Sequence, residues 1–413
     1  MSEVVQAARP TSGAYNALDR LLRQYVLRRL DALVDANVEL QDACGSVVLG
    51  QVNGQPLLRV CVTNPAFYQA VAAGGSVGAG QAYMAGLWHC DDLVALVRTL
   101  VRNRDVLDGM ESGLARLGGW ALRRWHAFKR NTEAGSRRNI AAHYDLGNEF
   151  FALFLSSDMM YSSAYWQGAH DTLEAASRRK LQVICEKLKL SPRDRLLEIG
   201  TGWGALAVHA AAYHGCHVTT TTISQEQYLA TCERVTRAGV ADRVTVLLED
   251  YRNLTGVYDK LVSIEMIEAV GADYLEGYFA QIGRLLKPDG LALIQAITIE
   301  DHRYRRALRA VDFIKRHVFP GSFIPSIEAM LCAKARTTDL GLLALEDFGD
   351  SYARTLAAWR LRFRSKVAQV RALGFDERFI RLWDFYLAYC EGGFRERAIG
   401  VAHLLLAKPG YRP

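Results

Sequence analysis

A short apolar strand that runs into a glycine-rich turn and then a helix constrains this chain more than any other feature. The segment reads Leu196-Leu197-Glu198-Ile199-Gly200-Thr201-Gly202-Trp203-Gly204, and a helical pattern begins at Ala205. Glycine lets the backbone adopt a left-handed conformation and come close to a ligand. The segment therefore predicts a ligand-binding turn at the end of a strand in an α/β fold.

Strands and helices alternate around this turn, which is typical of a parallel sheet with crossover helices. The predicted strands are Asp194–Ile199, His217–Thr222, Val244–Leu248, Lys260–Ile264 and Leu291–Ile297, with helices at Ala205–Tyr213 and Gln225–Ala238. Helical spacing then covers Tyr304–Phe319, Ser326–Thr337, Ser351–Leu373 and Glu377–Tyr389, before a last strand at Ile399–Leu406. We predict a Rossmann-like sheet with a helical cap over about residues 300–390, at the sheet edge where such folds bind ligands.

The turn fits two nucleotide ligands by spacing alone. Gly200, Gly202 and Ala205 satisfy the dinucleotide pattern. However, Glu198 precedes the turn, where it can meet a cationic amino acid, and Trp203 places bulk where a pyrophosphate turn prefers little side chain. The segment 220–224 that ends the second strand contains no acid for a ribose, and Gln227 is the nearest candidate. These features favour S-adenosylmethionine over NAD.

A third part of the predicted pocket follows the third strand. There Asp250 can accept from an adenine amino group and Tyr251 can stack on the ring.

The first hundred residues predict a small α/β domain. A helix is expected at Leu21–Asp31 and another at Asp91–Val101. Between them, Ser46–Thr63 is expected to form a hairpin that turns at Asn53-Gly54. Gly74–Gly80 is expected to be a glycine-rich break in regular structure before the second helix.

Composition excludes several classes of protein. The chain has 413 residues, enough for about two domains, and 50 Lys and Arg against 44 Asp and Glu, a surplus too small to imply nucleic acid. The eight cysteines form no Cys-x-x-Cys pair, and His89-Cys90 and His214 lack ligand-spaced partners, so no metal is expected. The apolar stretches are too short to span a membrane and no ordinary signal segment is present, which together with the cysteines predicts a cytoplasmic protein.

A basic, aromatic segment joins the two predicted domains. Between Arg116 and Arg138 lie seven Lys or Arg and one acid, with Trp120, Trp125 and Phe128 among them. Cations mixed with aromatics suit an anionic phospholipid surface, and a solvated helical linker and a nucleic-acid contact are the alternatives. A second basic run, Arg303–Arg316, is either a solvated helix face or a contact for phospholipid headgroups.

Six motifs in a fixed order resemble the cyclopropane-fatty-acyl-phospholipid synthase family, which includes the mycolic acid methyltransferases. They are Asn139–Asn148, Met160–Trp166, the glycine turn, Thr222–Gln227, Glu265–Gly271, and Val318–Gly321 with Pro325-Ser326. Asn64–Cys90 also resembles the N-terminal lipid-binding domain of the long family members. The resemblance implies three parts: an N-terminal lipid-binding domain over residues 1–115, a linker over 116–138, and a methyltransferase domain over 139–413.

The resemblance implies that S-adenosylmethionine donates a methylene carbon to the cis double bond of an unsaturated phospholipid acyl chain, giving a cyclopropane. The implied enzyme is peripheral at the inner membrane face and does not bind nucleic acid, and a homodimer is left open. The residues implied or predicted to bind the cofactor are Tyr161, Ser162, Glu198, Gly200, Gly202, Trp203, Gly204, Thr222, Ile223, Gln227, Asp250 and Tyr251.

The resemblance also implies a bicarbonate ion as the base, held by five positions. Three match the family: Glu268, the backbone of Ile297, and Tyr352. Two do not, because a Cys is replaced by Ser163 and a His by Gln295. Ser and Gln can still donate hydrogen bonds to a small anion. The cation formed on carbon needs an anionic or π-rich, water-poor site.

The two replacements leave other outcomes open. If the proton is lost elsewhere, the product is a methyl- or methylene-branched chain. A catalytically silent lipid-binding paralogue and a small-molecule or RNA methyltransferase are the alternatives from other classes. Cys390 matches the family's active-site Cys, although the chemistry requires no covalent enzyme intermediate.

Overall fold

The computed structural model describes residues 15–50, 54, 56–105 and 146–412. The chain divides into two units: residues 1–125, 310–318 and 367–396 make the first, and residues 126–309, 319–366 and 397–413 the second. The predicted linker over 116–138, most of the Asn139–Asn148 motif and the predicted turn residue Asn53 lie outside the described residues.

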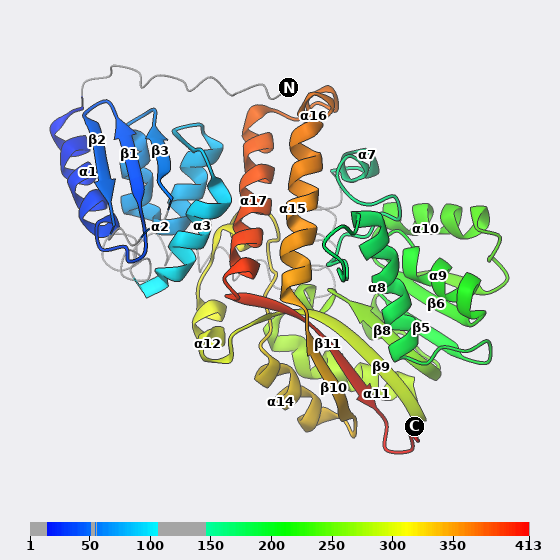
Figure 1. Cartoon of the computed structure of the whole chain (residues 1–413). Helices are drawn as coiled ribbons and strands as arrows, with labels where there is room; N and C mark the ends of the chain where they lie inside the picture. The colour runs from blue at the N-terminus through cyan, green and yellow to red at the C-terminus, as the bar shows by residue number, and fades with distance from the viewer. Residues whose placement is uncertain (1–14, 51–53, 55, 106–145, 413) are drawn as a thin grey trace. The chain divides into compact units, whose positions relative to one another are not determined.

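A seven-stranded sheet forms the centre of the second unit, with strand order β10-β11-β9-β8-β5-β6-β7 (Figure 1). The strands are β5 (Arg195–Ile199), β6 (His217–Thr222), β7 (Val244–Leu248), β8 (Tyr258–Ile264), β9 (Leu286–Ile299), β10 (Gly341–Asp347) and β11 (Ile399–Ala407). Strands β5 to β9 pair in parallel, whereas β11 is antiparallel to both β9 and β10. The Rossmann-like sheet is therefore confirmed.

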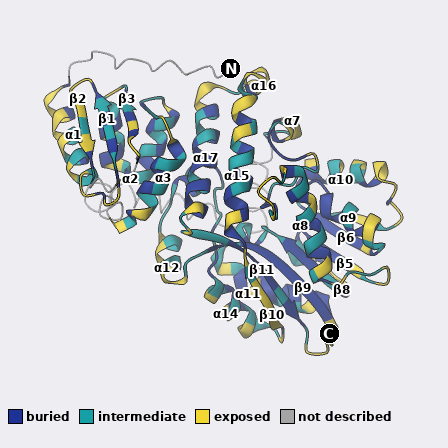
Figure 2. Ribbon diagram, viewed as in Figure 1, coloured by how far each residue is buried: buried dark blue, intermediate teal, exposed yellow. Residues whose placement is uncertain are grey.

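Helices cover both faces of the central part of this sheet, whose strands are buried on both sides (Figure 2). Leu196 belongs to a core with α8 (Leu173–Lys187) and α9 (Ala205–His214), and the next residue, Leu197, to a core with α11 (Leu275–Leu285) and α14 (Ile327–Thr337). The other elements are α7 (Asn148–Ala152), α10 (Gln225–Arg237), α12 (Asp301–Arg309), α15 (Gly349–Ser365), η1 (Tyr251–Asn253), η2 (Ile267–Ala269) and η3 (Ala272–Tyr274). Parallel pairing brings the carboxyl ends of β5, β6 and β8 to one edge.

The first unit contains a second sheet with the order β2-β1-β3-β4. Its strands are β1 (Val38–Asp42), β2 (Gly45–Leu49), β3 (Leu58–Val62) and β4 (Trp88–Cys90), and its first helices are α1 (Ala17–Leu30), α2 (Ala66–Met84) and α3 (Leu93–Arg102). The predicted hairpin within Ser46–Thr63 is wrong. β2 pairs with β1 in an antiparallel hairpin, and β3 pairs with β1 in parallel, because β1 was missed.

The predicted break in regular structure at Gly74–Gly80 is also wrong, since these glycines lie within α2. The helix is kinked at Gly75, whose φ of 54° and ψ of −132° are not helical. At Gly80 a Cβ would lie 2.4 Å from the ring of Phe313, so glycine permits close packing.

Three helices from the C-terminal half pack within the first unit: α13 (Phe313–His317), α16 (Val367–Ala372) and α17 (Glu377–Arg395). α17 packs against α2 and α3, α13 packs against α2, and α16 packs against α17. A Cβ at Gly392 of α17 would lie 2.5 Å from Val97 of α3. The units therefore differ from the predicted domains, which assigned these helices to a cap on the methyltransferase domain. Among the helices that the structure describes, none combines the length and apolar character that crossing a bilayer requires.

Candidate active site

The glycine turn follows β5 at the carboxyl edge of the large sheet. Its three glycines have positive φ angles: 95° at Gly200, 53° at Gly202 and 82° at Gly204, which caps α9. A Cβ at Gly202 would meet no atom within 4 Å. The hydroxyl of Thr201 is buried and has no hydrogen-bond partner among the described residues. The turn thus offers open backbone and an unused polar atom to a ligand.

Two buried polar side chains flank the turn on β5 and at the start of α10. Glu198 accepts a hydrogen bond from the Thr220 hydroxyl at 2.6 Å, and burial raises the pKa of Glu198 to about 8. Gln227 of α10 accepts from the Thr222 hydroxyl at the end of β6 at 2.9 Å, and Ile223 directly follows this strand. The structure therefore brings these predicted cofactor residues together.

Other predicted cofactor residues already contact neighbouring side chains of the protein. Asp250 accepts from the side chain of Arg252 at 2.6 Å, so it is less available to an adenine amino group than its position suggested. Tyr251 packs edge-on against Tyr278 with ring centroids 5.7 Å apart. Trp203 is buried, and its indole N–H donates to Asn148 Oδ1 at 2.7 Å.

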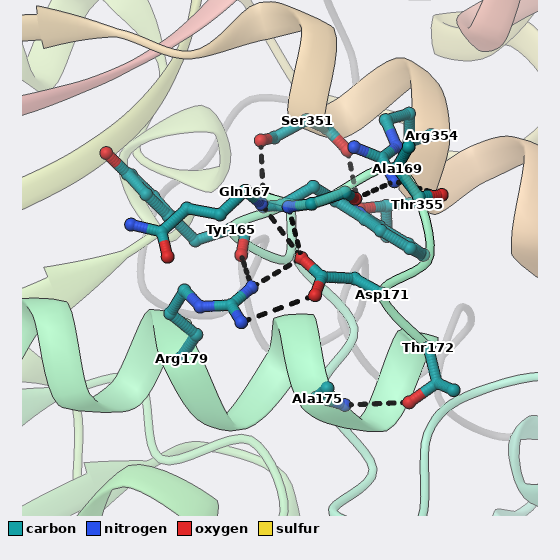
Figure 3. Close-up of polar contacts among 12 residues, drawn as sticks. Tyr165, Gln167, Ala169, Asp171, Thr172, Ala175, Arg179, Ser351, Arg354 and Thr355 are labelled. Carbon is teal, nitrogen blue, oxygen red and sulfur yellow. Dashed lines mark hydrogen bonds and ion pairs between the residues drawn. The ribbon is translucent and has the colours of Figure 1, made fainter.

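The segment from Tyr161 to Trp166 is held against α15 and α8. Tyr161 packs on Trp359, with ring centroids 5.4 Å apart, and the Ala164 N–H donates to the Thr355 hydroxyl at 3.1 Å. Figure 3 shows how the following loop is fixed, because Asp171 pairs with Arg179 of α8 at 2.6 Å. This anchoring fixes the backbone of Ser162 and Ser163 in the site.

A buried carboxylate, Glu265, collects the donors of the site. It accepts from the Ser163 backbone N–H at 2.9 Å, the Gln295 side-chain amide at 2.7 Å and the Tyr352 hydroxyl at 2.7 Å. Glu265 follows β8 directly and has a φ of 48°, a conformation that a residue with a side chain adopts at a cost of about 1–3 kcal/mol. Strained backbone of this kind clusters at functional sites.

Hydrogen bonding behind Gln295 fixes which way its amide points. His403 lies opposite Gln295 in the β9–β11 register, and its Nε2 is 2.9 Å from Gln295 Oε1. Lys187 Nζ, which can only donate, lies 2.7 Å from His403 Nδ1 and also pairs with Glu346. His403 must then carry its proton on Nε2 and donate to Gln295, which leaves the amide NH2 of Gln295 to face Glu265.

Glu268 is a second buried carboxyl beside Glu265. Its Oε1 accepts from the Ile297 backbone N–H at 2.5 Å, and its Oε2 has no partner among the described residues. Burial, reinforced by the charge of Glu265, raises the pKa of Glu268 to about 8. Burial also raises the pKa of Glu265, but Lys180 and the three donors oppose this shift.

Lys180 places a positive charge in this buried region. Its Nζ donates to the Ser162 hydroxyl at 2.6 Å, and burial lowers its pKa to about 8 against the attraction of Glu265, Asp158 and Glu198. Lys180 and His403 were not predicted from the sequence. Glu265 was visible only as part of the motif Glu265–Gly271, without a role of its own. A signal for Lys180 was present, because it lies at helical spacing on the apolar side of α8.

The expected bicarbonate site does not fit this arrangement. The Ser163 hydroxyl donates to the Ala164 carbonyl, and its backbone N–H, Gln295 and Tyr352 all donate to Glu265. A free anion would lose these donors to a side chain that is already present.

Cys390 belongs to α17 in the first unit, whereas Glu265 and Glu268 belong to the second. Burial raises the pKa of its thiol, which disfavours a thiolate nucleophile. Its predicted place in the site stays a prediction.

A cluster outside this site brings Cys185, His209 and His214 together, with one potential ligand atom from each within 4.8 Å of the others. Sequence spacing did not reveal it because Cys185 lies on a different helix from the two histidines. Burial raises the pKa of this thiol and lowers that of His209.

The fold and the glycine turn define a class I S-adenosylmethionine-dependent methyltransferase, with S-adenosylmethionine as its cofactor. The family model described as mycolic acid cyclopropane synthetase matches residues 131–404, and the chain belongs to this family.

Relatives within the family modify lipids in different ways. The chain is 38% identical to the tuberculostearic acid methyltransferase UfaA1 of Mycobacterium tuberculosis, over 81% of this chain and 80% of the relative. It is 36% identical to the cyclopropane-fatty-acyl-phospholipid synthase of Escherichia coli K12, over 86% of this chain and 90% of the relative. A solved structure of the mycolic acid cyclopropane synthase CmaA1 complexed with SAH and CTAB has a TM-score of 0.62 and 29% identity, covering 66% of this chain and 98% of that chain.

Proposed function

We propose that this protein transfers the methyl carbon of S-adenosylmethionine to the double bond of an unsaturated phospholipid acyl chain. The observation that carries the proposal is the pair of buried carboxyls, Glu265 and Glu268, beside the glycine turn. An alkene becomes a carbocation when it is methylated, and a buried anion stabilises that charge strongly. The names of the two relatives, a tuberculostearic acid methyltransferase and a cyclopropane-fatty-acyl-phospholipid synthase, support an acyl substrate.

The residues of the chain divide the work of this reaction. S-adenosylmethionine, when bound, supplies an electrophilic methyl group on a sulfonium. The glycine turn, Glu198 and Gln227 would hold it, because they present open backbone and buried polar atoms at the sheet edge. Positioning the weak alkene nucleophile in line with the sulfonium supplies much of the rate enhancement. The packed rings of Tyr161, Phe151 and Trp359 exclude water and offer π-electrons near the developing cation.

We favour a branched, still unsaturated product over a cyclopropane. Ser163 and Gln295 replace both titratable donors that the family resemblance assigns to the base, and their remaining donors are engaged by Glu265. The relative at 38% identity is also named as a methyltransferase. Ring closure needs the proton to leave the new methyl group, whereas loss from a neighbouring chain carbon gives a methyl-branched alkene.

Isotope retention tests both the activity and the product. The enzyme is incubated with methyl-deuterated S-adenosylmethionine and vesicles of unsaturated phospholipid, and the fatty acid methyl esters are analysed by gas chromatography and mass spectrometry. A methyl-branched alkene with all deuterium retained is expected. Loss of one deuterium with a saturated, ring-containing ester would show cyclopropane formation, and loss of one deuterium with an exocyclic alkene a methylene branch. No label in any acyl chain would refute the proposal and favour a silent lipid-binding paralogue.

The same proposal places the enzyme at the cytoplasmic face of an anionic membrane as a peripheral protein. The basic composition of residues 116–138 supports this, and so do the exposed Arg305, Arg306 and Arg309 of α12. Acyl carbons drawn from the bilayer cost about 0.8 kcal/mol per CH2 unless they are buried again, so an apolar channel is required.

A further inference from the structure

We infer that Glu265 is the resident base of this enzyme, so that the chain supplies its own carboxylate and needs no bicarbonate. The inference rests on the proposed function, since it names the group that accepts the proton after methyl transfer. The hydrogen bonds of Glu265, its location, the charges around it and the engagement of nearby donors all support this role.

The first is the hydrogen bonding of the carboxylate. Donors from three separate elements, the Tyr161–Trp166 segment, β9 and α15, converge on Glu265 at 2.7–2.9 Å. The chain of bonds from Lys187 through His403 orients Gln295 as a donor. Donors stabilise the ionised form of a carboxyl group, which is the form that can accept a proton.

The second is location. β5 and β8 are adjacent and parallel, with Ile199 opposite Ser263, so Gly200 and Glu265 leave the sheet at the same edge. A Cβ at Gly200 would lie 3.4 Å from the side chain of Met266, the residue after Glu265. The carboxylate therefore belongs to the loop that borders the cofactor turn.

The third is the charge around the group. Lys180 opposes the effect of burial on Glu265. The neighbouring carboxyl of Glu268, whose pKa is raised to about 8, is largely neutral at pH 7 and adds little repulsion. Lys180 and the three donors thus favour the ionised form of Glu265 against the effect of burial.

The fourth is that the donors expected to bind a second anion are already engaged. Ser163, Gln295 and Tyr352 are the positions where the resemblance placed a bicarbonate, and each already donates to Glu265. A bicarbonate placed beside Glu265 would also add a like charge in a buried region, which is unfavourable.

The step balances without an added oxidant or reductant. The π-electrons of the alkene form the new carbon–carbon bond to the methyl group, and the carbon–sulfur bond breaks with its electron pair going to sulfur. The cation left on the other alkene carbon is quenched when Glu265 removes a proton. The electrons of that carbon–hydrogen bond form either a new double bond or the ring. The proton then passes from Glu265 to solvent.

The test measures turnover in carbonate-depleted buffer and after bicarbonate is added. Wild-type turnover is expected to be the same in both conditions. Glu265→Gln keeps the shape of the side chain and is expected to lower kcat by ~10²–10⁴-fold, the usual effect of losing a general base. Glu265→Gly frees the three donors, and added bicarbonate is expected to restore part of its activity in a saturable way. Glu233→Gln, which removes an exposed carboxylate on α10, is the matched control.

The outcomes separate this inference from the proposed function. Stimulation of the wild type by bicarbonate, or full activity of Glu265→Gln, would overturn the inference while leaving acyl methylation intact. A wild type that methylates no acyl chain would instead refute the proposed function. Calorimetry of S-adenosylmethionine binding shows whether each variant is folded. If Glu265→Gly does not fold, the bicarbonate dependence of the wild type still decides the question.

Discussion

Replacing Lys180 by Met tests how the buried charges of the site are balanced. Met keeps the length of the side chain and removes its charge, as well as the 2.6 Å hydrogen bond to Ser162. Lys180 is fully buried, so its charge acts on Glu265 with little screening by water. An opposite charge close to a carboxyl group lowers the pKa of that group by about 1–3 units, and this contribution is lost in Lys180→Met.

The size of the effect follows from the ionised fraction of Glu265. Each unit by which its pKa rises above the assay pH reduces the carboxylate about tenfold. We expect kcat of Lys180→Met to fall at pH 7, by up to about 10–100-fold, and to recover as the pH rises and Glu265 becomes ionised again. The free energy of unfolding of Lys180→Met should instead fall as the pH rises, because the ionised carboxylate is then buried without its counter-charge.

The assay is the pH profile of kcat and of KM for S-adenosylmethionine, with thermal denaturation at each pH. Arg178→Met removes an exposed positive charge two residues earlier on the same helix and serves as the control. A loss of kcat that is equal at all pH values would show that Lys180 only supports the packing of α8. An unchanged profile would show that Glu265 does not depend on Lys180.

Three further predictions address the cofactor, the second carboxyl and the membrane. Gly202→Val places a β-branched residue at a φ of 53° in open space beside the turn, and calorimetry should show S-adenosylmethionine binding weakened at least about tenfold; wild-type affinity would mean the turn is not the cofactor site. The pKa of Glu268 is raised to about 8 from an ordinary value of about 4.3, so the wild type loses stability as pH rises through that range, by at most about 1.4 kcal/mol per unit. Glu268→Gln lacks this loss, so the difference between its melting temperature and that of the wild type should shift in favour of the variant as the pH rises to about 8. A difference that stays constant with pH would contradict a raised pKa for Glu268. Binding of the protein to anionic vesicles should weaken as the salt concentration rises, because the Debye length shortens. Equal binding to neutral vesicles at all salt concentrations would show that the basic segment 116–138 does not mediate membrane binding.

Local patterns in the sequence predicted the glycine turn, Glu198 and Gln227, because each lies within a few residues of a strand end. The strands β5 to β9 were found for the same reason, since their apolar runs are bounded by turns and helices. The edge strand β10 was missed: its residues are largely exposed, so burial imposes no pattern that distinguishes it from a loop.

Roles that depend on distant residues could not be predicted in this way. Glu265 was visible in its motif, but its function depends on donors from Ser163, Gln295 and Tyr352, which the fold brings together from positions up to 102 residues away. The error at the N-terminal hairpin has a similar origin, because β3 pairs with β1 across a connection that sequence spacing does not specify.

The composition of the first unit has a consequence for how the chain folds during synthesis. Its N-terminal part is made early, but α16 and α17, which complete its packing, are made only after most of the second unit. Until then, the apolar sides of α2 and α3 that α17 covers are left open to water or to other chains. The N-terminal part emerging from a ribosome is therefore a natural client for a chaperone. A chain that ends before residue 367 is prone to aggregate although the parallel strands β5 to β9 of its large sheet have all been made.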